Sequence, residues 1–325
     1  MKKLFLFSIS LILPLTTISC INTTSKERKE KKIRESLSSN LYIKEMLNVF
    51  SNNDINKKSI YVSQQENKSN SKINELRYAF VFYPPFIIDA INKNPDYKFL
   101  AKKSKDAIQK TLSQDWYWSL MNIDKFNFNF NPYGDRYKNF KKEEEWFENV
   151  KRTFGTLIMN IKNPRPEKLI NIQYKENLKV APFNVYSDKE IYYLVYDGNK
   201  AIKIWKYKEN GEIKYQIVPD LLVFNNPSNE KSINIESLLE NLESKIFEKR
   251  ISHFEAQYKK NKEDAKAFGE EFNEEEFLKR YLDKFYMKFQ EKFQYNGFLH
   301  EVLNEINKDY LKVYRFSMRS IYEKK

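Results

Sequence analysis

The stretch Ile191–Pro219, IYYLVYDGNKAIKIWKYKENGEIKYQIVP, decides the fold of this chain. Its three runs of aliphatic and aromatic residues are separated by Asp197-Gly198 and Asn210-Gly211, and such dipeptides between such runs are typical of antiparallel hairpins. Two earlier runs share this character, Leu169–Tyr174 and Val180–Tyr186. The sequence therefore predicts a small antiparallel β-meander over about residues 168–218.

The turn at Asn210-Gly211 allows two strand registers. A two-residue turn would pair Tyr207 with Lys214 and mix polar and apolar side chains on both faces of the hairpin. A three-residue loop over 209–211 would instead set Tyr207 opposite Ile213 and give one aromatic face. We predict the three-residue loop, because a meander with one buried face needs one apolar side.

Helical patterns precede the meander. Apolar spacing predicts a helix over Phe99–Met121 that ends in an aromatic cluster, and another over Phe140–Met159. Between them, three phenylalanines alternate with asparagines over Phe126–Asn131, which is the period of a strand. This alternation suits either a carbohydrate-contacting face or a half-buried edge strand, and we favour the edge strand.

Helical patterns also follow the meander. Apolar residues recur every three or four positions from Ile235 to Tyr258. Asn273, followed by three glutamates and flanked by Phe272 and Phe277, has the form of a capped helix start with a hydrophobic staple. Together with a last helix from Leu299, this start predicts an antiparallel helical hairpin within residues 233–322. The predicted fold class is α+β, predominantly helical, with a small antiparallel β-meander and a C-terminal antiparallel helical hairpin.

The N-terminus has the layout of a secretion signal. Residues 1–3 are dibasic, and the apolar run Leu4–Leu15 is shorter than the roughly 20 residues of a membrane-spanning helix. We predict that residues 1–19 are a signal peptide that is removed before Cys20. Because Cys20 is the only cysteine, no disulfide can form within the chain.

Residues 17–20 have the form of a bacterial lipobox, with Thr17 where leucine is commonest. The alternative is an ordinary signal with an unmodified cysteine, but a secreted protein rarely keeps one unpaired thiol. We predict that Cys20 carries acyl chains. These chains would hold the protein on a membrane, since each buried methylene contributes ~0.8 kcal/mol.

The sequence becomes polar and charged directly after Cys20. Residues 20–40 contain few large apolar side chains, so the surface they could bury does not offset the entropy of ordering them. We predict a solvated tether over residues 20–40. Residues 41–325 then form a single globular body, which is within the size range of one large domain.

The chain is basic, with a formal net charge of +13. Basic proteins attract polyanions, although the abundance of Lys, Asn, Ile, Phe and Tyr is also what an A+T-rich genome encodes without any polyanion partner. The last predicted helix carries four cations spaced so that they share one face. They could bind a polyanion or simply offset the helix dipole. These candidate polyanion-binding residues are Lys308, Lys312, Arg315 and Arg319.

Catalytic motifs are absent from the sequence. His253 and His300 lack metal-binding spacing, and no nucleophile elbow, phosphate loop, dinucleotide fingerprint or calcium loop occurs. Cys20 cannot act as a nucleophile once its sulfur carries a lipid. The sequence therefore predicts a non-enzymatic protein without a cofactor or a metal.

The relaxed lipobox at residues 17–20, the charged tether and the amino-acid bias resemble Borrelia-type spirochaetal outer-surface lipoproteins. The resemblance is specific over residues 1–40 and is one of composition over the body. It implies a lipid-anchored antigen on the outer surface of the outer membrane that contacts host matrix, serum proteins, glycosaminoglycans or nucleic acid. The alternative is a periplasm-facing lipoprotein in envelope assembly or small-ligand binding, with a pocket lined by aromatic residues of the segment 116–130.

Overall fold

One antiparallel sheet organises the chain in the computed structural model, which describes residues 37–69, 71–82, 95–130, 158–173, 190–225, 234–277, 299, 302–303, 305–306 and 311–316. Its strands lie in the order β2-β1-β7-β6-β5-β4-β3. In chain order they are β1 (Phe128–Phe130), β2 (Ile158–Met159), β3 (Lys168–Gln173), β4 (Glu190–Tyr196), β5 (Lys200–Glu209), β6 (Glu212–Phe224) and β7 (Leu311–Phe316). With the helices described next, this sheet confirms the predicted α+β class.

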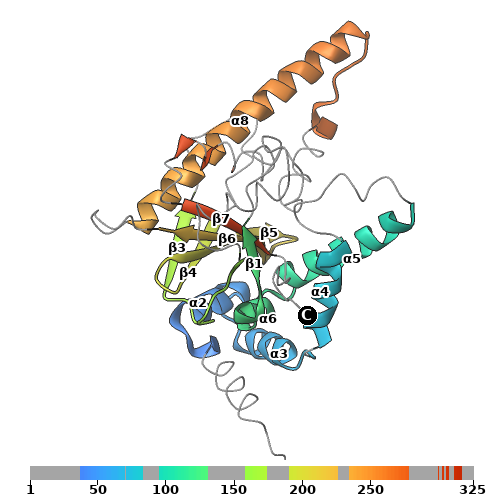
Figure 1. Ribbon diagram of the computed structural model, residues 1–325. Helices are drawn as coiled ribbons and strands as arrows, with labels where there is room; N and C mark the ends of the chain where they lie inside the picture. Colours follow the sequence, from blue (N-terminus) through green and yellow to red (C-terminus); the bar gives the residue numbers. More distant parts are fainter. Residues whose placement is uncertain are drawn as a thin grey trace, which may run out of the picture.

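Helices cover both faces of the sheet (Figure 1). The long helix α8 (Ile235–Ala267) lies on one face. On the other face lie α2 (Leu41–Phe50), α3 (Ile55–Glu66), α4 (Ser71–Phe82), α5 (Pro95–Ser113), α6 (Trp116–Met121) and the 3-10 turn η1 (Ile123–Lys125). Two separate clusters of buried apolar residues fill these interfaces, so the sheet is an inner layer.

The predicted meander is present as β3, β4, β5 and β6, which pair in sequence order. Side chains of β4 alternate between the two clusters: Tyr192 and Leu194 face the α2–α6 side, whereas Tyr193 and Val195 face α8. Because both faces are buried, the strand is apolar at nearly every position. The predicted strand Val180–Tyr186 lies outside the described residues.

The predicted register of the β5–β6 hairpin is wrong. Asn210 and Gly211 both have positive φ, 51° and 77°, and form a two-residue turn that pairs Tyr207 with Lys214. Asn-Gly suits such a turn because both residues tolerate the left-handed region. The prediction failed because it assumed one buried face, whereas this sheet has two.

Strand β6 is longer than predicted and runs through Pro219 to Phe224. The register with β5 shifts here, since Ile202 pairs with Leu221 but Ile204 pairs with Ile217. Pro219 falls inside this irregularity and has no partner in either neighbouring strand. A proline is tolerated at such a bulge because no ladder hydrogen bond requires its missing N–H.

Strand β7 replaces part of the predicted final helix. It lies between β6 and β1, with Leu311 and Val313 packed on the α8 side and Tyr314 and Phe316 packed on the other. A run of β-branched and aromatic residues is better suited to this doubly buried position than to a surface helix. The prediction of helix over residues 311–316 is therefore wrong.

The C-terminal helical segments that precede β7 are present. Asn273 caps a helix that starts at Glu274, because its side-chain oxygen accepts a hydrogen bond from the Glu276 N–H at 3.0 Å. The predicted staple is confirmed, since the rings of Phe272 and Phe277 lie 5.7 Å apart. Helical residues recur at 299, 302, 303 and 305, and Leu299 and Val302 are fully buried on the α8 side.

The body includes residues that were predicted to belong to the tether. Leu37 is fully buried in the cluster on the α2–α6 side. Asn40 caps α2 by accepting hydrogen bonds from the N–H groups of Tyr42 and Ile43, and its amide also donates to the Pro166 carbonyl at 3.0 Å. This last contact ties the start of α2 to the segment that enters β3.

Two other predicted elements differ in their bounds. The helix predicted over Phe99–Met121 is divided into α5 and α6, with a break at residues 114–115. The helix predicted over Phe140–Met159 is wrong at its end, where Ile158 and Met159 form β2, and residues 140–157 lie outside the described part. Strand β1 has β2 and β7 as neighbours, so it is not the predicted edge strand.

Candidate functional site

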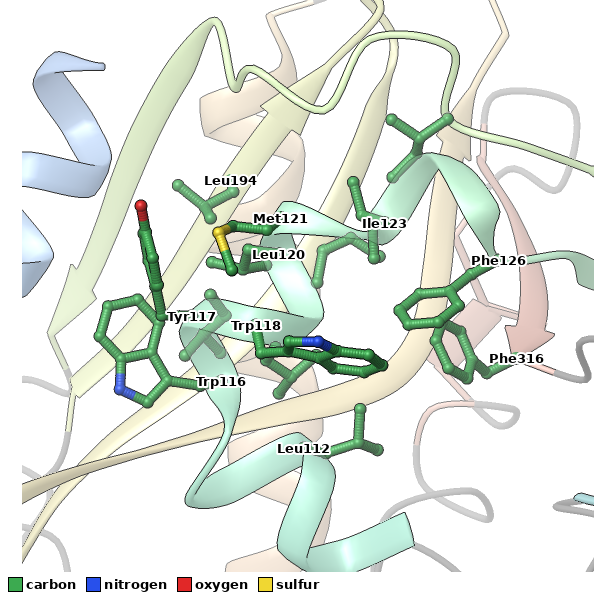
Figure 2. Packing of buried hydrophobic residues seen from close by; sticks show 14 of the residues in the cluster. Leu112, Trp116, Tyr117, Trp118, Leu120, Met121, Ile123, Phe126, Leu194 and Phe316 are labelled. Atoms are coloured by element: carbon green, nitrogen blue, oxygen red, sulfur yellow. The ribbon is translucent and has the colours of Figure 1, made fainter. Parts of the chain in front are cut away.

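The most distinctive feature of the described interior is a cluster of aromatic side chains around helix α6, which we call the aromatic cluster. All six residues of α6, WYWSLM, are buried. A helix this short can be buried on every side only when its neighbours enclose it, and α3, α5 and β6 all contact α6. Figure 2 shows how its side chains pack. The sequence predicted the aromatic run but not its enclosure.

The aromatic cluster contains two groups of ring contacts, one around Trp116 and one around Phe316. Trp116 meets Phe50, Tyr61 and Tyr215 at centroid distances of 5.7, 5.8 and 5.1 Å, which joins α2, α3 and β6. These edge-on and stacked geometries are the ones that aromatic pairs favour, at about 0.5–1.5 kcal/mol each beyond area burial. The contacts around Trp116 therefore fix α2 and α3 onto the sheet.

The second group of ring contacts lies at the β1 and β7 strands of the sheet. Phe316 of β7 packs on Phe126 and Phe128 at 4.3 and 4.9 Å, and Phe126 reaches Trp118 at 6.4 Å (Figure 2). Phe126 and Phe128 are fully buried. The alternating Phe/Asn segment therefore does not present these two rings as an open carbohydrate-contacting face.

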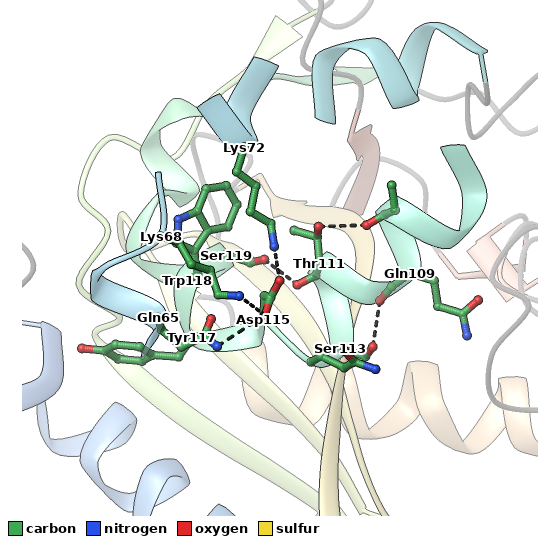
Figure 3. A network of polar contacts seen from close by, with 12 residues as sticks. Gln65, Lys68, Lys72, Gln109, Thr111, Ser113, Asp115, Tyr117, Trp118 and Ser119 are labelled. Carbon is green, nitrogen blue, oxygen red and sulfur yellow. Dashed lines mark hydrogen bonds and ion pairs between the residues drawn. The ribbon is translucent and has the colours of Figure 1, made fainter. Parts of the chain in front are cut away.

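A charged network lies beside the aromatic cluster at the break between α5 and α6 (Figure 3). The carboxylate of Asp115, only 3% exposed, forms ion pairs with Lys68, at 2.8 Å, and with Lys72. Gln65 donates a further hydrogen bond to it at 3.3 Å. The ammonium group of Lys72 also lies 5.0 Å from the ring centre of Trp118, so this lysine links the network to the aromatic cluster.

The network controls the charge state of its members. Burial raises the pKa of Asp115, but the hydrogen bonds and charges of Lys68 and Lys72 outweigh it, and the pKa lies below its usual value. Burial also lowers the pKa of Lys72, despite its bond to Asp115. Burial raises the pKa of Tyr61 well above its usual value, so this phenol stays neutral. Asp115 is thus an ionised anchor between helices, already neutralised by two cations.

A second ion pair is buried on the opposite face of the sheet. Lys203 of β5 and Glu243 of α8 are each about 1% exposed, and the Lys203 ammonium lies 2.6 and 2.8 Å from the two Glu243 oxygens. The hydroxyl of Tyr193 donates a hydrogen bond to the same carboxylate. Isolated buried charges are very costly, so this mutual satisfaction is required for α8 to seat on the sheet.

Sequence reasoning missed both charged networks, although the second left a signal. Lys203 shares a strand face with Ala201 and Trp205, and Glu243 lies beside Leu239 and Leu242 on the apolar stripe of α8. One lysine and one glutamate on otherwise apolar faces indicate a buried pair. Asp115 gave no comparable pattern, because its partners come from the turn before α4 and from α4 itself.

The predicted basic stripe is not a helical face. Lys312 and Arg315 lie in strand β7, where residues three apart cannot share a face. The two residues between these cations, Val313 and Tyr314, are buried on opposite faces of the sheet, which is the pattern of a strand and not of a helix. Lys308 and Arg319 lie outside the described residues, as does Cys20.

Two further properties concern metals and membranes. Among the described residues, no three or more His, Cys, Asp or Glu side chains come together in a group that could hold a metal ion. Within the same part of the chain, no helix combines the length and the apolar composition needed to cross a membrane.

Together these features define an α+β protein whose sheet is enclosed by helices and held by a buried aromatic cluster. A family model described as "Aromatic cluster surface protein" matches residues 19–273, which is more than half of the chain, and the chain belongs to this family. No curated protein and no solved structure has significant similarity to the chain. The family description indicates a surface protein.

Proposed function

We propose that this chain is a lipid-anchored surface protein that acts by binding, without catalysis, and that it presents its body to host matrix, serum proteins or polyanions. The observation that carries the proposal is membership of a surface protein family over residues 19–273. The match begins one residue before Cys20, at the predicted processing site. A lipid on Cys20 would supply the membrane attachment that a surface protein needs.

The closed aromatic cluster supports a binding surface over a small-ligand pocket. Trp116, Tyr117, Trp118 and Phe126 are each 2% exposed or less, and their rings contact one another. A small-ligand site would need these rings to line an opening. The periplasm-facing alternative with such a pocket is therefore the less favoured function.

Display on the outer membrane of a spirochaete is a finer proposal, and it rests on the resemblance of residues 1–40 alone. The charge argument comes from the whole chain, because its formal net charge of +13 favours contact with negatively charged partners. Binding of this kind would be salt-sensitive, since salt screens exposed charges beyond about 10 Å at 0.1 M.

The lipid anchor can be tested by fatty-acid labelling. Cells that express the wild-type chain should incorporate a labelled fatty acid into the protein and retain it in the membrane fraction. Cys20→Ser should lose the label, whereas Ser19→Ala should keep it because alanine retains a small residue before the cysteine. Equal labelling of the wild type and Cys20→Ser would contradict the anchor.

Polyanion binding can be tested on immobilised heparin at moderate salt. Lys308→Ser/Arg319→Ser removes two of the predicted cations and leaves strand β7 unchanged. A matched control, Lys259→Ser/Lys262→Ser, removes two exposed cations of α8. Retention weakened in the first variant alone would support the assignment of these residues. Equal retention of both variants would contradict it, and no retention of the wild type would contradict polyanion binding.

A further inference from the structure

The distal part of α8 forms an arm that leaves the sheet. The helix has 33 residues and is therefore about 50 Å long at 1.5 Å per residue. Its first half is seated on the sheet by buried Leu239, Leu242 and Ile246. The second half of α8 projects away from the sheet (Figure 1).

The segment that follows α8, residues 272–277, folds back along this arm and packs against it. Tyr258 meets Phe272 and Phe277 at ring-centre distances of 5.2 and 5.7 Å, and its hydroxyl donates a hydrogen bond to Glu274 at 2.9 Å. Phe277 also contacts Phe254 at 5.7 Å. These contacts hold the arm together without using the end of α8.

The end of the arm, residues 263–276, carries a charge opposite to that of the chain. It contains seven carboxylates and one lysine, and all eight of these residues are exposed. We call it the acidic apex. Phe268 lies within it at the end of α8 and is 80% exposed, the most exposed of the large hydrophobic residues in the described part. The acidic apex thus combines negative charge with one accessible aromatic ring.

The outward face of α5 has the complementary properties. Phe99 is 71% exposed, and Lys103 and Lys110 follow at helical spacing on the same face, with Lys102 beside them. One exposed acid, Asp106, lies between them, so lysines outnumber carboxylates three to one among the exposed charged side chains of residues 102–110. Within the described part of the chain, none of these three lysines forms an ion pair. We call this surface the basic α5 face.

We propose that the acidic apex of one molecule docks on the basic α5 face of a second copy of the chain. Opposite charge would steer the encounter, and Phe268 and Phe99 would bury apolar surface at its centre. The two surfaces lie at separate places on one molecule (Figure 1), so the contact joins different surfaces of the two copies, and it extends into open chains wherever the rotation between copies does not close. The membrane anchor proposed above would favour such a weak contact, because it confines the copies to one surface.

The experiment is sedimentation velocity of the full chain from residue 20, with Cys20→Ser for solubility, at up to about 1 mM protein. The wild type should show concentration-dependent association that weakens as salt rises, because salt screens the ion pairs. Glu270→Lys/Glu271→Lys on the apex should weaken association at least tenfold. Lys103→Glu/Lys110→Glu on the α5 face should do the same.

Mixing the two charge-reversed variants provides the specific readout. Each variant alone carries only one of the two surfaces with its full charge. The mixture contains the unaltered apex of one variant and the unaltered α5 face of the other, so it should associate again, as pairs of molecules. The matched control Glu45→Lys/Glu240→Lys makes the same change in net charge at exposed sites far from the apex and should associate as the wild type does.

Three results would overturn the proposal. A monomeric wild type over the whole concentration range would exclude a second copy as the occupant and leave a basic partner protein. Unchanged association of either reversed variant would exclude that surface. Failure of the mixture to associate, with circular dichroism showing both variants folded, would exclude direct contact between the two surfaces.

Discussion

Removing one partner of the buried Lys203–Glu243 pair should destabilise the protein strongly. Lys203→Met would leave the Glu243 carboxylate, about 1% exposed, with the hydrogen bond from Tyr193 and without the ammonium that contacts both of its oxygens. Breaking a buried pair in this way costs about 3–5 kcal/mol, because the carboxylate stays in the interior after losing the cation bound to both of its oxygens. We expect a loss of this size in the free energy of unfolding.

Removing both charges should restore much of that loss. In Lys203→Met/Glu243→Leu the interior charge is gone, and apolar replacements of similar volume are often neutral or stabilising. The Tyr193 hydroxyl then loses the Glu243 carboxylate as acceptor, and losing such a buried hydrogen bond costs about 1–3 kcal/mol. Adding Tyr193→Phe should therefore bring the triple variant close to the wild type.

The assay is urea unfolding followed by circular dichroism, and Lys208→Met is the control. Lys208 lies on the same strand and is exposed, so its replacement should change the free energy of unfolding by less than about 0.5 kcal/mol. The reasoning would be refuted if Lys203→Met cost less than about 1 kcal/mol, or if the double variant were as unstable as the sum of the two single variants.

Three further predictions address the aromatic cluster, the Asp115 network and the hairpin. Phe316→Ala should lower the free energy of unfolding by about 3–5 kcal/mol, because its ring packs against Phe126 and Phe128. The control Phe268→Ala removes an exposed ring and should change the free energy of unfolding by less than about 0.5 kcal/mol. Equal effects of the two substitutions would refute the described packing. The pKa of Asp115 is lowered in the folded state, so its ionised form adds stability above the unfolded pKa of about 3.9 and loses it as pH falls through the folded pKa. Asp115→Asn should therefore be less stable than the wild type at pH 7, and the difference should shrink towards pH 3 in urea unfolding; a difference independent of pH would contradict this linkage. Gly211→Ala should cost about 1 kcal/mol because φ at this position is 77°, and no loss in thermal or urea unfolding would argue against the two-residue turn.

Local chemistry predicted much of this fold. Asn273 and its two flanking phenylalanines specified a helix start that the structure reproduces, because capping and staple contacts lie within a few residues of one another. The turns at Asp197-Gly198 and Asn210-Gly211 specified the order of β4, β5 and β6 for the same reason. Features that depend on neighbours in sequence were therefore accessible.

Features that depend on distant partners were not accessible. Strand β7 is not recognisable from the sequence because its neighbours, β1 and β6, are remote in sequence and its two buried faces hide any amphipathic period. The hairpin register failed for a related reason, since nothing local showed that α8 would cover a second face of the sheet. The partners of Asp115 come from the segment around α4 and could be found only once α4 and α5 were packed together.

The location of the body tests the central claim most directly. Intact cells and gently lysed cells would be treated with proteinase K and blotted for this protein beside a known periplasmic protein. The proposed surface display predicts loss of the protein from intact cells while the periplasmic control survives. Survival in intact cells, with loss only after lysis, would contradict surface display and would place the body in the periplasm.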